Sequence, residues 1–105
     1  MERTDTIAAI STPQGTGGIA IIKISGPDAC RILSSCFRPA KRNFPSPPRD
    51  LSFGKVQSGD GSFVDEAVAL YFEGPKSYTG EDVAEIQCHG GTAAARAVLA
   101  EVISA

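Results

Sequence analysis

The sequence predicts an α+β fold in which a mixed β-sheet packs against two helices. Five short runs rich in apolar and β-branched residues have the pattern of strands, and two other stretches place apolar residues at helical spacing. Along the chain the order is two strands, a helix, three strands and a second helix. Because strands and helices do not alternate one for one, a doubly wound parallel sheet is disfavoured. A length of 105 residues allows one domain, which we expect to span residues 1–105.

The first half of the chain supplies two strands and a helix. Residues 6–11 and 19–24 are predicted strands, separated by a glycine-rich loop. Ser25 and Asp28 are spaced as in a capping box, and the intervening Pro27 suits a first helical turn. The predicted helix ends before Pro39. Its apolar positions are Ala29, Ile32, Leu33, Cys36 and Phe37.

The second half supplies three strands. Residues 38–50 hold four prolines and four basic residues, so we predict an exposed loop or, alternatively, a small phosphate-contacting patch. Strands are predicted at 51–57, 64–72 and 83–88, with a hairpin turn at 58–61. The strand at 64–72 has apolar residues on both faces, which predicts a central position in the sheet.

The last element is an alanine-rich helix that begins after His89 and two glycines. No terminating signal precedes Ala105, so we expect the natural chain to continue beyond it. The apolar stripe of this helix consists of Ala95, Val98, Leu99, Val102 and Ile103.

The composition is that of an ordinary globular chain. Apolar residues make up 42% and charged residues 21%. The net charge of -2 argues against a nucleic-acid-binding surface over the whole domain, but is compatible with a local basic patch. No apolar run approaches the roughly 20 residues that span a bilayer, and no signal peptide is evident, so we expect a cytoplasmic location and no membrane contact. Three cysteines, an odd number, favour free thiols over disulfides.

The glycine-rich loop is the first place that could carry chemistry. Gly15, Gly17 and Gly18 look like a fragment of a phosphate-binding loop. A dinucleotide fingerprint requires a third glycine where this chain has Ala20, and the Gly-Lys-Ser/Thr ending of a Walker loop is absent. Two interpretations of this loop remain. It is either a flexible turn between strands or a glycine-lined surface that a flat ligand can approach closely.

A pair of charges inside apolar strands is the second place. Lys23 interrupts a run of isoleucines, and Glu85 lies between Ala84 and Ile86. A half-buried charge needs a partner or a function. One interpretation is a cross-strand ion pair or exposure on an edge strand. The other is a pair of ligand-orienting groups, with the cation for a carboxylate and the anion for a ring that carries an amine.

His89 is the third place. The sequence offers neither a Ser-His-Asp order nor metal-ligand spacing with the cysteines, so a structural or ligand-lining role is favoured over a catalytic one. Glu81 and Asp82 are expected to cap a loop or helix rather than to act as paired acids. Core packing accounts for Cys36.

Two long motifs resemble one family. The first is Asp5-Thr6-Ile7, followed by Thr12-Pro13, the glycine loop, and Ile24 to Asp28. The second runs from Gly74 through Tyr78 to Glu85 and on to Gly91. Both resemble the N-terminal domain of the MnmE (TrmE) family of tRNA-modification GTPases, and the resemblance covers essentially the whole chain.

The resemblance implies a folate-binding domain, similar to that of the glycine-cleavage T protein, that forms a homodimer. It also implies binding of 5-formyltetrahydrofolate as a one-carbon source. In that family the intact protein works with MnmG (GidA) on the wobble uridine of tRNA. GTP, Mg and K belong to a GTPase domain that these residues do not include, so this chain alone is not expected to hydrolyse GTP.

The resemblance also implies a folate site at Lys23 and Glu85. Family members typically have Arg where this chain has Lys23, and Lys lacks the planar fork that holds a carboxylate bidentately. A further folate-contacting Lys of the family lies beyond residue 105. Gly17, Gly18, Tyr78 and His89 are additional candidates, and no catalytic or metal-binding residue is assigned. The alternative is a structural dimerisation or interaction domain that does not retain folate binding.

Overall fold

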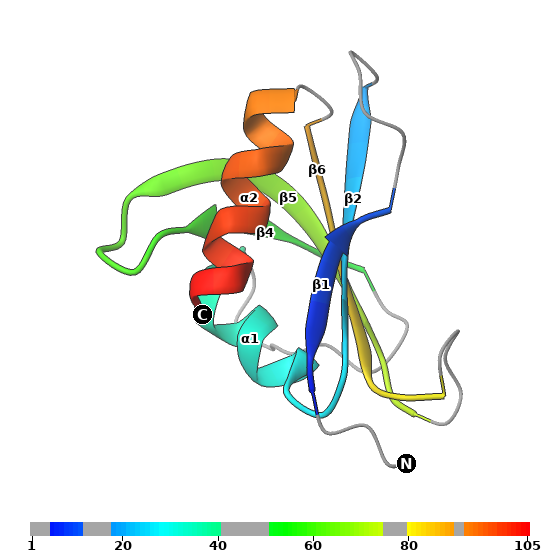
Figure 1. The fold of residues 1–105 in the computed structure, drawn as a ribbon. Coiled ribbons are helices and arrows are strands. Elements are labelled where there is room, and N and C mark those ends of the chain that lie inside the picture. The colour runs from blue at the N-terminus through cyan, green and yellow to red at the C-terminus, as the bar shows by residue number, and fades with distance from the viewer. Residues whose placement is uncertain (1–4, 12–17, 41–50, 75–79, 90–91) are drawn as a thin grey trace.

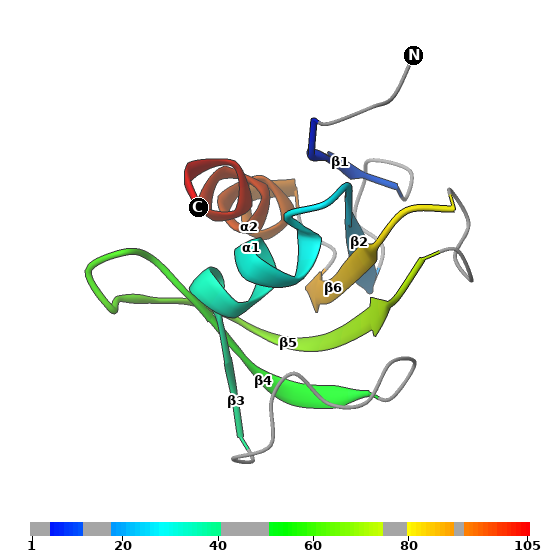
Figure 2. The same cartoon turned by 90° about the horizontal axis from the view of Figure 1, so that it is seen from below.

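The computed structural model describes residues 5–11, 18–40, 51–74, 80–89 and 92–105, and it shows a six-stranded sheet with both helices on one side (Figures 1 and 2). The predicted α+β class is confirmed, with one strand more than expected. The elements in chain order are β1 (Ile7–Ile10), β2 (Ile19–Ser25), α1 (Ala29–Cys36), β3 (Phe37–Pro39), β4 (Ser52–Gln57), β5 (Phe63–Phe72), β6 (Val83–His89) and α2 (Thr92–Ser104).

The sheet is antiparallel throughout, so the prediction of a mixed sheet is wrong. The strand order is β1-β2-β6-β5-β4-β3, and each neighbouring pair is antiparallel. Short connections join β1 to β2, β4 to β5 and β5 to β6. Because a parallel pair needs a long crossover, strands joined by a short connection pair in antiparallel fashion. The expectation that β5 is central is confirmed, because β5 lies between β6 and β4.

The core lies between the sheet and the two helices, on what we call the helix-covered face. Ile22 and Ile24 of β2 and Ile86 of β6 are fully buried there, because alternate residues of a strand point to the same side. Figure 2 shows the sheet curling around the two helices. The helices contribute Leu33 and Cys36 of α1, and Ala95, Val98 and Val102 of α2. The predicted α2 stripe is confirmed except at Ile103, which is exposed on the flank of the stripe.

The beginning of α1 differs from the predicted capping box. Asp28 is in the N-cap position, but its carboxylate makes no capping hydrogen bond. Instead, the backbone N–H of Asp28 donates to Oγ1 of Thr6 at 3.0 Å. Gly26 allows this approach, because its φ is +143° and a Cβ there would lie 2.5 Å from the Cα of Thr6. A residue that precedes β1 therefore holds the start of the helix.

The last residue of α1 is Cys36, two residues before the end that Pro39 predicted. Phe37 has extended backbone dihedrals and begins β3, although its ring is as buried as its helical spacing predicted. Nη1 of Arg38 donates to the carbonyl oxygen of Ser34 at 2.9 Å. A cation at this position satisfies one of the open carbonyls of the last turn and complements the helix dipole.

The β4–β5 connection is the predicted hairpin turn. The N–H of Ser58 donates to the carbonyl of Ser62, and the N–H of Gly61 donates to the carbonyl of Ser58. The carboxylate of Asp60 accepts hydrogen bonds from Ser58 and Ser62, which lower its pKa to about 2. Within the described ranges, neither helix has the length and apolar character needed to cross a membrane.

Candidate functional site

The surface of the sheet opposite the helices, here called the helix-free face, carries the charged strand residues except Asp65, which pairs with the core residue Val56 on the helix-covered face. The side chains of the helix-free face alternate with the core positions along each strand, as the register of the sheet shows. They are Ile7 and Ala9 from β1, Ile19, Ile21, Lys23 and Ser25 from β2, Val83, Glu85, Gln87 and His89 from β6, Glu66, Val68, Leu70 and Phe72 from β5, Phe53 and Lys55 from β4, and Arg38 from β3.

Lys23 and Glu85 are direct cross-strand partners on this face. Nζ of Lys23 lies 3.8 Å from Oε1 of Glu85, and the two side chains are 37% and 11% exposed. The cross-strand ion pair proposed from sequence is therefore confirmed. The edge-strand alternative is wrong, because β2 and β6 both have neighbours on each side. A separation of 3.8 Å exceeds a hydrogen bond, so this contact is an electrostatic attraction between partly screened charges.

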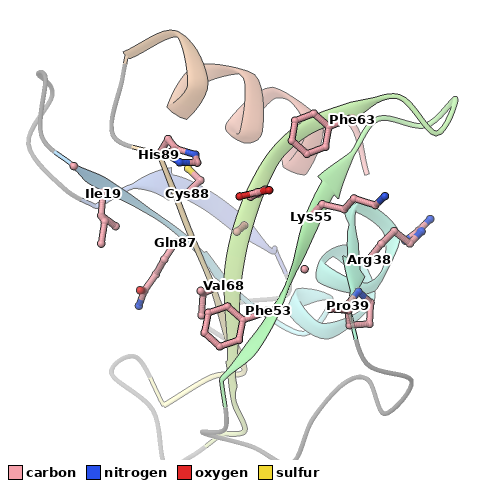
Figure 3. Close-up of a pocket in the computed structure, with 15 residues that line it drawn as sticks. Ile19, Arg38, Pro39, Phe53, Lys55, Phe63, Val68, Gln87, Cys88 and His89 are labelled. Atoms are coloured by element: carbon pink, nitrogen blue, oxygen red, sulfur yellow. The ribbon is translucent and has the colours of Figure 1, made fainter.

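A cavity of about 940 Å³ opens on the same face, lined by residues of five strands (Figure 3). The figure shows its labelled lining residues spread over β2, β6, β5, β4 and β3. Ile19, Val68 and Phe53 give it an apolar wall, and Phe63 stands at one end. Arg38, Lys55, Glu66 and His89 supply charged or ionisable groups. This size and mixture of surfaces are typical of sites for small molecules and cofactors.

The candidate residues divide between the ion pair and the cavity. Gly18 and His89 line the cavity, whereas Lys23 and Glu85 do not. Gln87 connects the two places, because it lines the cavity and follows Glu85 by two residues on the same face, a distance of about 7 Å along a strand. Gly17 and Tyr78 lie outside the described residues.

His89 is held by a residue that sequence reasoning missed. Its backbone N–H donates to Oδ2 of Asp65 at 2.9 Å, and its ring Nδ1 lies 2.7 Å from Oδ1 of the same carboxylate. The described β5–β6 pairing ends at Val68 and Gln87. The backbone N–H of His89, beyond this end, is satisfied by the Asp65 side chain instead of by a backbone carbonyl of β5. The available signal was the acidic pair Asp65-Glu66 near the start of an otherwise apolar strand.

Arg38 connects the cavity with the helix layer. Its guanidinium donates to two carbonyl oxygens at the end of α1, those of Ser34 and Phe37, while the residue lines the cavity. The other basic residues of the predicted phosphate-contacting patch, Lys41, Arg42 and Arg49, lie outside the described residues.

The cysteines are free thiols, as predicted. Burial raises the pKa of Cys36 and that of Cys88 to about 11. Sγ of Cys36 donates to the carbonyl of Ile32 within α1, which agrees with its assignment to the core. Cys30 is half-buried on α1. The described residues contain no group of three or more His, Cys, Asp or Glu side chains placed to hold a metal ion.

Asp82 caps a loop, as the sequence indicated. Its Oδ1 accepts a hydrogen bond from the backbone N–H of Gly74 at 2.9 Å. Burial and the nearby Asp82 carboxylate raise the pKa of Tyr71 to about 12. This carboxylate is therefore part of the structural framework and is not a member of an acid pair.

The fold and this face define a small α+β domain with a cofactor-sized cavity on its open sheet surface. Residues 6–105 match the model of the family described as GTP-binding protein TrmE N-terminus. The chain belongs to this family, as the two motifs indicated.

Curated relatives support this assignment. The tRNA modification GTPase MnmE of Symbiobacterium thermophilum is 48% identical over 104 residues, which cover 96% of this chain and 22% of the relative. The MnmE of Carboxydothermus hydrogenoformans is 50% identical over 98 residues, covering 90% of this chain and 21% of the relative. The MnmE of a Roseiflexus species is 46% identical over 101 residues, which cover 96% of this chain and 22% of the relative. The chain thus spans about a fifth of the length of these relatives.

Proposed function

We propose that residues 1–105 form the N-terminal domain of a cytoplasmic tRNA-modification GTPase, and that this domain binds 5-formyltetrahydrofolate and joins two copies of the protein. The observation that carries the folate proposal is the Lys23–Glu85 pair, a carboxylate and an ammonium held side by side on a sheet face that no described helix covers. Support also comes from relatives that are named tRNA modification GTPases.

The residues present fit a folate chemically. Glu85 is an acceptor, and the aminopyrimidine edge of a pterin presents N–H donors. Lys23 supplies a cation for a carbonyl or carboxylate of the ligand. The cavity on the same face adds an apolar wall of Ile19, Val68 and Phe53, against which a ring system packs. The set therefore contains an acceptor, a donor and an apolar surface on one face.

The bound folate supplies a one-carbon unit for modification of the tRNA wobble uridine. GTP, Mg and K act in a GTPase domain outside this chain, and MnmG (GidA) and tRNA are partners of the whole protein. Within this division of labour, Lys23 and Glu85 bind and orient the folate.

Glu85→Gln tests the folate proposal. The substitution keeps the shape of the side chain but replaces an acceptor oxygen with a donor. Losing a charged hydrogen-bond partner costs about 1.5 to 3 kcal/mol, so we expect the affinity for 5-formyltetrahydrofolate to fall by roughly 10- to 150-fold in a calorimetric titration of the 105-residue chain. Asp28→Asn is the control, because it makes the same charge change at the exposed start of α1.

Two results would count against the proposal. Equal affinity of Glu85→Gln and the parent contradicts the role of Glu85. A parent chain that binds no folate favours the alternative, a structural dimerisation or interaction domain without folate binding.

Exposed apolar residues on the helix-free face support self-association. Ile7, Ile19 and Phe53 are 49%, 61% and 68% exposed there. Large apolar side chains gathered on one sheet face favour contact with another surface, and a two-fold contact between copies uses the same patch twice. We infer that the helix-free face meets a second copy of the chain.

Sedimentation at tens of micromolar tests self-association. We expect a mass near twice 10.9 kDa for the parent and a shift toward the monomer for Phe53→Ser. Ile103→Ser is the matched control, because Ile103 is 67% exposed but lies on α2, on the other side of the sheet. A concentration-independent mass near 10.9 kDa for the parent contradicts the proposal.

A further inference from the structure

Asp65 and His89 form a two-point contact at the edge of the cavity. One oxygen of the carboxylate is 2.9 Å from the backbone nitrogen of His89, and the other is 2.7 Å from ring Nδ1. The Asp65 side chain is only 11% exposed, whereas the imidazole is 66% exposed. A buried carboxylate therefore anchors a ring that is largely accessible, and that ring lines the cavity.

This contact determines which ring nitrogen carries the proton. An ionised carboxylate accepts hydrogen bonds and donates none, so the Nδ1 that faces Asp65 must carry the hydrogen. In the neutral imidazole, Nε2 is then an acceptor. Nε2 lies on the opposite side of the ring from Nδ1, away from the anchoring carboxylate. The bond to the backbone N–H restrains Asp65 further, so the carboxylate has little freedom to release the ring.

We propose that Asp65 is a positioning residue that holds His89 in the Nδ1–H tautomer, so that Nε2 accepts a hydrogen bond from an N–H or O–H group of the ligand in the cavity. This inference rests on the proposed function, because the ligand is the folate. Folates carry N–H donors both on the ring system and at the amide of the tail. The cavity thereby selects ligands that present a donor next to an apolar ring, which packs against Val68 and Ile19.

His89 is the only histidine of the chain, so its imidazole gives the only ring-nitrogen signals. Two-bond ¹H–¹⁵N spectra of the neutral imidazole show which ring nitrogen carries the hydrogen. We expect Nδ1–H in the parent. In Asp65→Asn the amide oxygen accepts the His89 backbone N–H and the amide group donates to Nδ1, so we expect the proton to move to Nε2. Nε2–H in the parent, or identical spectra for parent and variant, would overturn the inference.

A titration with 5-formyltetrahydrofolate tests the ligand contact. His89→Asn places an amide nitrogen where Nδ1 was and keeps the bond to Asp65, but it removes the acceptor at Nε2. We expect this variant to melt at the parent temperature and to bind the folate about three- to tenfold more weakly. We expect Asp65→Asn to weaken binding by a similar factor, because it turns Nε2 from an acceptor into a donor.

The outcomes separate this inference from the proposed function. If the parent binds folate and His89→Asn binds it equally well, the inference is wrong and the proposed function stands. If the parent binds no folate but shows the Nδ1–H tautomer, the proposed function is wrong, while the positioning of His89 by Asp65 is confirmed.

Discussion

The two faces of the sheet are built from the same strands but have different chemistry. On the helix-covered face, Ile22, Ile24 and Ile86 are completely buried beneath α1 and α2. On the helix-free face, the residues between them along the same strands include Lys23 and Glu85. Of the three buried polar or charged side chains among the described residues, Glu85 lies on the helix-free face, whereas Ser52 and Asp65 lie on the helix-covered face, where they pair with Ala69 and Val56. Most of the apolar burial is on the helix-covered face, and most of the charged strand residues lie on the helix-free face.

The comparison teaches that alternate positions of one strand serve different purposes. A substitution on the helix-covered face should act on stability, because it removes contacts from a close-packed core. A substitution on the helix-free face should act on binding or association and leave the monomer fold nearly unchanged. The following predictions test this separation in order of expected size.

The largest effect is expected for a pair of phenylalanines. Phe37 is 1% exposed on the helix-covered face, whereas Phe53 is 68% exposed on the opposite face. Phe37→Ala should lower the free energy of unfolding by about 3 to 5 kcal/mol, the usual cost of removing a buried aromatic ring. Phe53→Ala should change it by less than about 0.5 kcal/mol. Urea denaturation, at protein concentrations too low for self-association, measures the free energy of unfolding of both variants. Equal losses of stability for Phe37→Ala and Phe53→Ala would contradict the distinction between the faces.

A smaller effect is expected at the contact between β3 and β4. A Cβ on Gly54 would lie 2.2 Å from the carbonyl oxygen of Arg38 and 2.7 Å from Cζ of Phe37, so the strand and the ring must move to accept it. Gly54→Ala should destabilise the domain by about 1 to 3 kcal/mol. Gly59→Ala is the control, because nothing lies within 4 Å of a Cβ there. Thermal melts of the two variants give the comparison, and matching melting temperatures would show that no such crowding exists.

The smallest effect on stability is expected for the ion pair. Lys23→Ala should lower the free energy of unfolding by no more than about 1 kcal/mol, because the lysine is partly exposed. Arg31→Ala, which breaks the exposed Asp28–Arg31 pair on α1, should cost less. We also expect Lys23→Ala to weaken folate binding and Lys23→Arg to preserve it. Lower stability of Lys23→Ala with unchanged folate affinity would limit Lys23 to a structural role.

Local sequence signals accounted for most of the elements. Apolar periodicity and turn residues placed both helices, five of the six strands and the hairpin turn at 58–61. They missed β3, because Phe37 fits the helical stripe of α1 and its buried ring satisfies either backbone conformation. They also could not reveal that every strand pair is antiparallel, because pairing depends on contacts between distant parts of the chain.

The candidate site was predictable only where local sequence signals mark its residues. Lys23 and Glu85 were recognisable as charges within apolar runs, and alternation along each strand was enough to propose that they meet. Asp65 was missed because its role depends on where the β5–β6 pairing ends, and nothing near Asp65 in the sequence reports that point. His89 was recognised as a ligand-lining candidate, but the carboxylate that holds it comes from 24 residues earlier.

The burial of two thiols has a practical consequence for labelling. With a pKa of about 11, the thiols of Cys36 and Cys88 are ionised to only roughly one part in ten thousand at pH 7, and the thiolate is the form that reacts with maleimides. Cys30, half-buried on α1, is then the preferred attachment point. A dye placed there is carried by the helix layer and leaves the helix-free face untouched. The 105-residue chain therefore permits fluorescent reporting on ligand binding and assembly without any added or removed cysteine.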